Sequence, residues 1–518
     1  MEHSGVQRKS APTLFTLERV AEILFAMLLA AGAILLLVEG TLSALSPYQL
    51  EFGEGNVLAS SLRMARGESV YLPITAQPPY IFSPYGPLLY GIQAPLLRWF
   101  GTSFAPGRFL SLLATFVSAA LLVLLLQRWT HSWRIALLFG MLYPSLPEVG
   151  MWAPILRADP LAVAFSLAGL YVISVTTRRW PLATMFFLAA MLVKPTLVAA
   201  PAAVFLYMLV EKQPRRALAF AATMASALLL IIFWGQHVTA GGFLSQLVGS
   251  HPESYTLKHY AAVATLVGRE QFIPTLMVVA FVVVSVRRRA VTLPLLYLAM
   301  ALLSTFSGGM AGASANHFLD WMAAVCVGAG MAYSFAEEGP SILARQACSV
   351  ALLGMVVCAL LFSTLAWLTW TEVEPGPLDQ VAGLVPYAQR IFPIDTSVPQ
   401  GCIELQHYLQ ALPGEHVVSE ETGDAVLSGK TLLITDPYSY GQLVINGKLP
   451  GKPLEDMLRA HQIAAVVLAH DVPRLRADKT DRWSTSFLNA VEQDYQLDRS
   501  FECTNGKAAY LPRREPAR

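Results

Sequence analysis

The amino-acid sequence predicts a mainly α polytopic integral membrane protein, with about eleven transmembrane helices and a small α/β domain after them. Of the 518 residues, 55% are hydrophobic and only 14% are charged, whereas soluble domains usually carry about 25% charged residues. The acidic residues are unevenly spread, because 15 of the 35 Asp and Glu lie in residues 1–370 and 20 lie in the last 148. A long apolar region therefore precedes a more ordinary domain.

The predicted transmembrane domain covers residues 20–370 and follows a predicted cytoplasmic tail at 1–19. Two of its apolar segments, 134–147 and 181–193, are shorter than the roughly 17 residues that a perpendicular helix needs. We expect them to extend into polar flanks or to end short of the interface. The eleven predicted spans lie at 20–46, 106–127, 134–147, 158–176, 181–193, 196–210, 216–234, 272–286, 291–306, 317–335 and 346–370.

Lys and Arg in the short loops predict the orientation, because cytoplasmic loops carry an excess of these residues. With a cytoplasmic N-terminus, every basic loop falls on the cytoplasmic side. The sequence thus predicts an integral protein of the plasma (inner) membrane, in contact with membrane lipid, with an extracytoplasmic C-terminal domain. The basic residues are Arg128 and Arg134, Arg178 and Arg179, Lys212, Arg215 and Arg216, Arg287 to Arg289, and Arg345.

The first external loop, residues 47–105, is long and rich in Pro, Gly and aromatic residues. Its apolar stretch 88–100 ends in Trp99 and Phe100, which are typical of the membrane interface. We expect this stretch to form an amphipathic helix in the plane of the membrane rather than a span.

The extracytoplasmic domain is predicted to cover residues 371–518. It holds Cys402 and Cys503, the two cysteines that lie outside the predicted spans. An extracytoplasmic compartment permits a disulfide between them, and two free thiols is the alternative. Alternating short apolar runs and helical patterns predict strands at 416–419, 432–435 and 464–468 and helices at 402–412 and 453–461.

Charge and motifs exclude several classes of function. The formal net charge is +1 and no block of like charges occurs, so nucleic acid is not an expected partner. The sequence also lacks a CxxC pair, an HExxH motif, a phosphate-binding P-loop and a nucleotide-binding glycine fingerprint. It therefore gives no indication of a redox centre, a zinc protease or an NTPase, and predicts no cofactor.

Two carboxylates, Glu51 and Glu54, follow the first predicted span and are separated by Phe52 and Gly53. Glycine lets a ligand approach the backbone, and one of two acids three residues apart can accept a proton from a hydroxyl group. The alternative is a solvated loop end with no chemical role.

Arg157, Asp159 and Lys194 are charged residues beside predicted spans. Asp159 precedes Pro160, a pattern typical of a helix cap, with Arg157 paired locally. In the functional alternative, Asp159 lies beside the first-loop carboxylates and Arg157 faces an anionic headgroup. Lys194 stands at the predicted external side, where phosphate is a natural ligand for a lysine. A snorkelling lysine that reaches the interface is the alternative.

A small-residue loop at 307–315 leads to Asn316, His317 and Asp320. On a helix, Asn316 and Asp320 share a face, as do His317 and Asp320. A polar cluster would then point into the bundle, either as part of a site or as a structural network between helices.

At these residues the sequence resembles the GT-C class of polytopic glycosyltransferases, and within it bacterial relatives of protein O-mannosyltransferases and lipid A aminoarabinose transferases. The order and placement of the motifs carry the resemblance over residues 15–370. One departure is that members commonly have adjacent acids in the first loop, whereas Gly53 precedes Glu54 here, so which acid is the base stays open. The matching motifs are Glu51 and Glu54, Gly67 to Tyr71, Tyr85 to Leu88, Gly107-Arg108, Arg157 and Asp159, Lys194, and Asn316-His317.

The resemblance implies transfer of a sugar from a polyprenyl-phosphate donor to a hydroxyl of a glycan, lipid or protein acceptor, at the extracytoplasmic face and with inversion. It implies Glu54 as general base with Glu51 as the second candidate, and Lys194 and Arg157 as ligands of the phosphate. No metal is expected, because the nearer relatives mostly work without one. Contacts to sugar or acceptor are expected from Asp159, Asn316, His317, Asp320 and Tyr85.

Two other functions use the same features. A lipid-linked sugar flippase or transporter would employ the carboxylates as proton or cation sites. However, the sequence shows no internal repeat, and its polar groups gather on one side of the predicted membrane. A non-catalytic scaffold, whose working part is the C-terminal domain, would lack a cavity that joins the first loop to Asp159 and Lys194.

Overall fold

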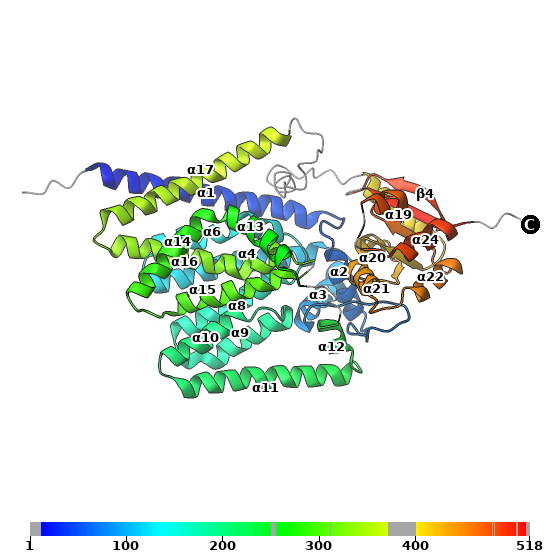
Figure 1. The fold of residues 1–518 in the computed structure, drawn as a ribbon, viewed down its shortest axis with the longest axis horizontal. Helices are drawn as coiled ribbons and strands as arrows, with labels where there is room; N and C mark the ends of the chain where they lie inside the picture. Colours follow the sequence, from blue (N-terminus) through cyan, green and yellow to red (C-terminus); the bar gives the residue numbers. More distant parts are fainter. Residues whose placement is uncertain are drawn as a thin grey trace, which may run out of the picture.

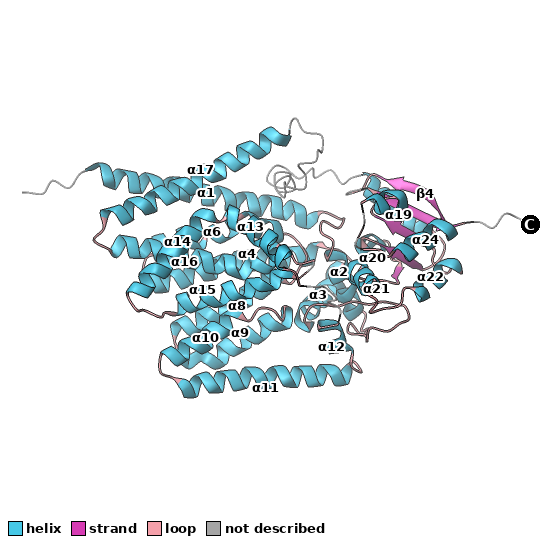
Figure 2. Ribbon diagram, in the orientation of Figure 1, coloured by secondary structure: helices cyan, strands magenta, loops and turns pink. Residues whose placement is uncertain are grey.

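The structure, a computed structural model, describes residues 12–249, 255–310, 312–370, 400–478, 480, 482–503 and 506–513. Most of the predicted cytoplasmic tail and the first part of the predicted extracytoplasmic domain, 371–399, lie outside the described residues. Figure 1 shows a bundle of roughly parallel helices with the C-terminal domain at one end, and Figure 2 shows that the sheet is confined to that domain.

Each predicted span coincides with helical structure, so the polytopic membrane class is confirmed. Among the described residues, five helices are long and apolar enough to cross a membrane alone, and a bent pair gives up to six. Shorter apolar helices, such as α8 and α10, would need adjacent helical segments to complete a membrane crossing. The count of eleven spans stays a prediction. The helices are α1 (Pro12–Leu45), α4 (Ala105–Thr130), α5 (Trp133–Gly140), α6 (Leu142–Ser145), α7 (Pro147–Trp152), α8 (Asp159–Val175), α9 (Trp180–Val193), α10 (Ala199–Val210), α11 (Pro214–Val238), α14 (Phe272–Arg287), α15 (Leu293–Ser304), α16 (Leu319–Glu338) and α17 (Ile342–Trp370).

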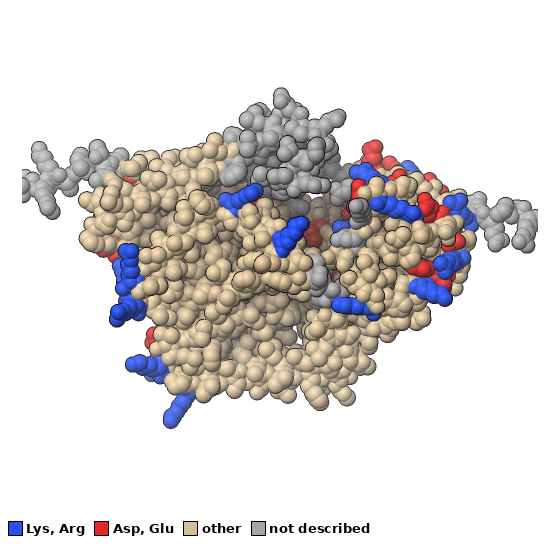
Figure 3. Space-filling view, in the orientation of Figure 1, with Lys and Arg blue, Asp and Glu red and all other residues tan. Residues whose placement is uncertain are grey.

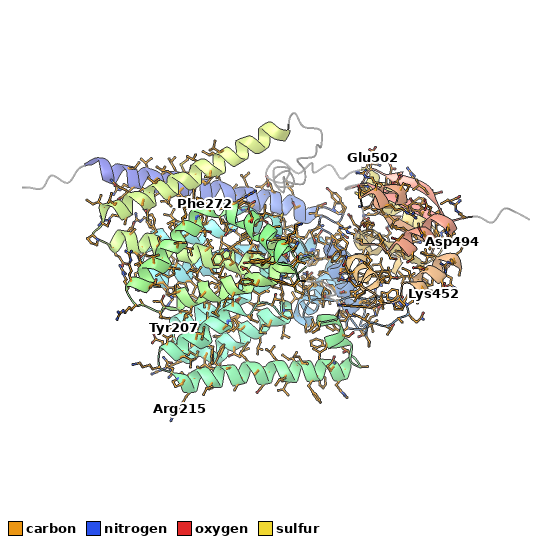
Figure 4. The ribbon with its side chains drawn as sticks, viewed as in Figure 1. Tyr207, Arg215, Phe272, Lys452, Asp494 and Glu502 are labelled. Carbon is orange, nitrogen blue, oxygen red and sulfur yellow. A yellow bond between two sulfur atoms is a disulfide. The ribbon has the colours of Figure 1, made fainter. Side chains whose placement is uncertain are left out.

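Basic side chains protrude at the end of the bundle that lies away from the C-terminal domain, while the surface between the two ends is largely uncharged (Figure 3). Arg215 lies at that basic end, and Lys452, Asp494 and Glu502 lie in the C-terminal domain at the other (Figure 4). This separation is the one that the positive-inside rule requires of a bundle crossing a membrane. The orientation of the termini stays a prediction.

The C-terminal domain has a five-stranded sheet in the order β2-β1-β3-β5-β4. The strands are β1 (His416–Ser419), β2 (Thr431–Leu432), β3 (Ala465–Leu468), β4 (Tyr495–Phe501) and β5 (Lys507–Pro512), of which β1 to β3 are parallel. The predicted strands match β1 to β3, although β2 is shorter than expected. The helices are α19 (Gln400–Ala411), α20 (Thr422–Leu427), α21 (Pro437–Ile445), α22 (Lys452–Arg459), α23 (Val472–Ala477) and α24 (Thr485–Asp494).

The first external loop extends this sheet. The N–H of Tyr80 donates to the carbonyl of Leu433 at 2.7 Å, and the N–H of Thr435 donates to the carbonyl of Tyr80 at 3.1 Å. Residues 433–435, predicted as part of the second strand, thus pair with the first loop instead of lengthening β2. This pairing attaches the C-terminal domain to the loop that carries the two acids.

The first-loop helices α2 (Glu54–Ala65) and α3 (Pro87–Phe100) lie between the bundle and the C-terminal domain (Figure 1). α3 coincides with the predicted in-plane helix, and its last residues, Trp99 and Phe100, are 79% and 68% exposed. The sequence did not predict α2 (Glu54–Ala65), α12 (Gly242–Leu247) or α13 (Leu257–Glu270). Cys402 and Cys503 form a disulfide, which packs against Tyr48 and Leu50 of the first loop.

Candidate active site

Glu54 is the first residue of α2 and is fully buried against α4. Its Oε1 and Oε2 accept from Nε and Nη2 of Arg108, each at 2.7 Å. They also accept the N–H of Leu156 and of Leu50, both at 2.8 Å. The carboxylate is thereby saturated, and Arg108 also donates to three carbonyls at the end of α1 and just beyond it. Glu54 has the surroundings of a residue that positions the loop, and the solvated-loop interpretation is wrong for it.

Glu51 lies three residues earlier and is the more accessible acid. Its side chain is 20% exposed, whereas that of Glu54 has no exposed surface. One oxygen, Oε2, accepts the N–H of Gly53 at 2.8 Å and lies 3.4 Å from Nε of Arg157. Burial raises the pKa of Glu51, and the charge of Arg157 opposes part of that increase. An accessible carboxylate with a raised pKa suits a general base better than Glu54 does.

Arg157 lies directly over Gly53. A Cβ atom on residue 53 would stand 1.8 Å from Nη1 of Arg157, so only glycine leaves room for the guanidinium. The guanidinium also faces the rings of Trp152 and Tyr85, at 5.6 and 5.8 Å from their centroids. Its Nε makes no hydrogen bond within the described structure, so Glu51 holds it loosely.

Asp159 begins α8 but does not cap it. Its side chain makes no capping hydrogen bond to that helix; instead, Oδ1 accepts from Nζ of Lys194 and, at 3.1 Å, from Nδ2 of Asn316. Lys194 is buried, so it does not reach the interface. The cap and the snorkelling lysine, both considered from the sequence, are therefore wrong. Three segments far apart in the chain meet at one carboxylate.

These residues border a partly open pocket, with about 310 Å³ of space outside protein atoms when the open side is counted. Asp320 accepts the hydroxyl of Tyr297 at 2.5 Å, and Nδ1 of His317 lies 3.0 Å from Oγ of Ser307. Arg157 connects the first loop to the pocket, because its guanidinium pairs with Glu51 and it lies two residues before the lining residue Asp159. The lining residues are Asp159, Val163, Lys194, Thr196, Leu197, Ser304, Ser307, Asn316, His317 and Asp320.

The structure thus divides the predicted site residues into two neighbouring groups. Asp159, Lys194, Asn316, His317 and Asp320 line the pocket, as the sequence predicts. The other group belongs to the first loop and the segment before α8; it comprises Glu51, Tyr85 and Arg157, with Glu54 buried beneath them. None of these four lines the pocket itself.

The C-terminal domain supplies residues that sequence reasoning missed. Tyr438 meets the ring of Phe52 edge-on, with centroids 6.5 Å apart, and the guanidinium of Arg482 lies 4.3 Å from the Phe52 ring. A Cβ atom on Gly312 would stand 2.9 Å from the Tyr438 ring. Tyr438 therefore lies between the loop with Glu51 and the loop with Asn316. No local pattern marks it, because its place depends on how the two domains dock.

Within the described residues, no group of three or more His, Cys, Asp and Glu side chains is placed to hold a metal ion. The absence of a resident metal or cofactor stays a prediction.

Comparison with known proteins identifies the fold. Residues 84–236 match the family model of dolichyl-phosphate-mannose-protein mannosyltransferase. The match includes Tyr85, Arg108, Arg157, Asp159 and Lys194 but neither Glu51 nor Asn316. No curated protein sequence matches the chain.

Two groups of solved structures share the architecture. ArnT from Cupriavidus metallidurans bound to undecaprenyl phosphate is 13% identical, with a TM-score of 0.59 over 93% of this chain and 97% of that one. Its apo form gives a TM-score of 0.58 at 12% identity, with the same coverage. The Archaeoglobus fulgidus oligosaccharyltransferase tethered to an acceptor peptide containing the NVT sequon is 12% identical, with a TM-score of 0.50 over 93% of this chain and 74% of that one. The chain has the GT-C fold, as the resemblance in the sequence implies.

Proposed function

We propose that this protein is an inverting glycosyltransferase that moves a sugar from a polyprenyl-phosphate donor to an acceptor hydroxyl at the extracytoplasmic membrane face. The juxtaposition of Glu51 and Arg157 with the pocket around Asp159 carries the proposal. Glu51 is an accessible carboxylate paired at 3.4 Å with Arg157, and Arg157 precedes the pocket residue Asp159 by two positions, which supports a base and a phosphate ligand next to a polar pocket. The lipid donor agrees with the undecaprenyl phosphate bound by the similar ArnT structure.

Arg157 is the cation that we assign to the donor phosphate. Lys194 is buried and already bonded to Asp159, whereas Arg157 is held by Glu51 only at 3.4 Å. A guanidinium binds phosphate well, since its planar fork matches two phosphate oxygens. Arg157 thus replaces Lys194 as the first candidate from the sequence.

Binding of the phosphate at Arg157 makes the Glu51 carboxylate more basic. The phosphate competes with Glu51 for the guanidinium and brings a negative charge close to the carboxylate. Both effects raise the pKa of Glu51 further, because they favour its neutral form. The donor therefore makes Glu51 a stronger base at the moment when one is needed.

In the transfer step, Glu51 takes the proton of the acceptor hydroxyl while the hydroxyl oxygen attacks the anomeric carbon. The bond from that carbon to the phosphate oxygen breaks, and its electron pair leaves with the polyprenyl phosphate, next to Arg157. Attack opposite the phosphate inverts the anomeric centre. A general base of this kind contributes roughly 10²–10⁴-fold to the rate.

The acceptor is expected to approach between Glu51 and the C-terminal domain. Phe52 and Tyr438 border that side, since Phe52 follows Glu51 directly and contacts Tyr438. The acceptor hydroxyl belongs to a glycan, a lipid or a protein.

The test uses the purified full-length protein in lipid vesicles with radiolabelled undecaprenyl-phosphate sugars and a membrane extract as acceptor, following loss of label from the carrier. Wild type is compared with Glu51→Gln and Glu54→Gln. Glu68→Gln is the matched control, because Glu68 is an exposed acid of the same loop paired with Arg63.

Turnover that disappears in Glu51→Gln and persists in Glu68→Gln supports the proposal. Full turnover by Glu51→Gln would remove Glu51 as the base. Saturable binding of every donor without turnover would overturn the enzyme assignment in favour of a flippase or a scaffold.

A further inference from the structure

Two buried carboxylates line the pocket with one oxygen each left without a hydrogen-bond partner. Asp159 is 1% exposed and Asp320 is 5% exposed. Oδ1 of Asp159 accepts from Lys194 and Asn316, and Oδ1 of Asp320 accepts from Tyr297, but Oδ2 of each acid is unpartnered within the described structure. Buried polar atoms without partners are costly, so an occupant that brings donors to them would bind favourably.

The charge of the pocket favours the same kind of occupant. Its lining includes two acids and a single lysine, so the carboxylates outnumber the ammonium groups by one. Including Glu51 and Arg157, which pair with each other, leaves that difference unchanged. In a buried site, a second negative charge placed among these groups is strongly unfavourable, because little water is present to screen it.

Arg157, the cation that we assign to the donor phosphate, is not among the residues that line the pocket. The charge of Lys194 is balanced by Asp159, whereas Arg157 can exchange its weak contact with Glu51 for a contact with the phosphate. The phosphate at Arg157 and the pocket beside Asp159 then accommodate adjacent parts of one molecule. The sugar ring is the part of the donor joined directly to the phosphate, so it is the part nearest to the pocket in this arrangement.

We propose that this pocket selects the sugar of the donor, accepting rings that offer hydroxyl groups to Asp159 and Asp320 and rejecting rings that carry a negative charge. This inference rests on the proposed function and deepens it, since it names the substrate class. A neutral hexose linked to the polyprenyl phosphate is accepted, and the corresponding uronic acid is rejected. Asp320 is the specificity-determining residue, because it lines the pocket and makes no ion pair within the described structure.

The experiment compares undecaprenyl-phosphate glucose with undecaprenyl-phosphate glucuronic acid, which differ only in the oxidation of C6. Binding of each lipid to the purified full-length protein in nanodiscs is measured directly, and loss of sugar from the carrier is measured in parallel. Asp320→Asn keeps the size and removes one charge. Asp456→Asn, an exposed aspartate of the C-terminal domain, is the control with the same change in charge.

We expect the wild type to bind the glucosyl lipid at least about tenfold more tightly than the glucuronosyl lipid, a difference of about 1.4 kcal/mol. Asp320→Asn should shrink that ratio several-fold, and Asp456→Asn should leave it unchanged. Equal or tighter binding of the glucuronosyl lipid, or an unchanged ratio in Asp320→Asn, would overturn the inference.

The binding measurement distinguishes failure of the pocket selectivity from failure of the transferase function. If the glucosyl lipid binds selectively but is never turned over, the transferase function fails and the pocket selectivity stands. If both lipids are turned over equally, the function stands and the selectivity fails. If neither lipid binds, both are overturned.

Discussion

Glu54 and Arg108 form a two-pronged ion pair with both N···O distances at 2.7 Å, and neither side chain has any exposed surface. Breaking a buried pair by removing one charge leaves the other unpaired and costs roughly 3–5 kcal/mol. We therefore expect Glu54→Gln to lower the free energy of unfolding by about that amount. Thermal unfolding of the purified protein in nanodiscs measures the change.

Glu51→Gln is the matched comparison, because it changes the same atoms three residues away. It should leave the unfolding midpoint close to that of the wild type and lower the rate of sugar transfer about 10²–10⁴-fold. The reverse pattern, with a stable but inactive Glu54→Gln and an active Glu51→Gln, would return the role of base to Glu54.

Gly53→Ala tests the placement of Arg157. The added methyl group would meet Nη1 of Arg157 at 1.8 Å, so the guanidinium must leave the position in which we propose that it binds the phosphate. We expect binding of undecaprenyl phosphate to weaken by about tenfold, as measured with purified protein in nanodiscs. Gly91→Ala is the control, since a Cβ atom there meets nothing within 4 Å. Equal affinities in the two variants would contradict the proposed role of Arg157.

Hydropathy predicted where the helices of the bundle lie, because each span depends on about 20 consecutive residues and little else. The choice between Glu51 and Glu54 could not be made in this way. Which of two loop acids is buried depends on Arg108, 54 residues further along the chain. The sequence identified Arg108 only as part of a motif and gave it no partner.

The sequence predicted which charged and polar residues line the pocket, but not which of them pair with one another. Asp159 beside Pro160 is typical of a helix cap, yet its carboxylate pairs with Lys194 and Asn316, which lie 35 and 157 residues away. Tyr438 had no local signal at all, since its neighbours belong to another domain. Tertiary contacts of this range follow from the fold and not from any short pattern.

The disulfide between Cys402 and Cys503 is predicted to stabilise the docking of the C-terminal domain as well as its fold. It closes a loop with a sequence separation of 101 and packs against Tyr48 and Leu50. A loop of this size corresponds to roughly 4–5 kcal/mol in the chain-entropy model. We expect the variant with both Cys402→Ser and Cys503→Ser to unfold at a lower temperature and to exchange amide hydrogens faster over residues 46–53. Cys348→Ser, a free cysteine of the bundle, is the control, and unchanged exchange in the double variant would contradict the docking role.

Tyr438 is predicted to act on the acceptor through Phe52. Removing the ring in Tyr438→Ala should raise the amount of membrane extract needed for half-maximal transfer several-fold, with a smaller effect on the maximal rate. Tyr438→Phe should restore the wild-type value, because the edge-on contact needs only the ring. A loss of maximal rate alone, without a change in half-saturation, would show that Tyr438 does not position the acceptor.

Asp424 is predicted to make the docked C-terminal domain less stable as the pH rises. The residue lies in α20, next to Gly423, whose N–H donates to Oε1 of Gln49 in the first loop at 2.8 Å. The pKa of Asp424 is raised from 3.8 to about 7, chiefly by burial; the charge of Glu421 adds to this increase and the charge of Lys507 opposes it. The folded protein therefore binds more protons than the unfolded chain between those two values. Its stability falls with rising pH across this window, by up to about 1.4 kcal/mol per pH unit.

Asp424→Asn should abolish this slope, so that the variant gains stability over the wild type above pH 7 and matches it near pH 4. Unfolding midpoints measured from pH 4 to 8 test this, with the exposed Asp456→Asn as control, and parallel slopes for Asp424→Asn and wild type would contradict it.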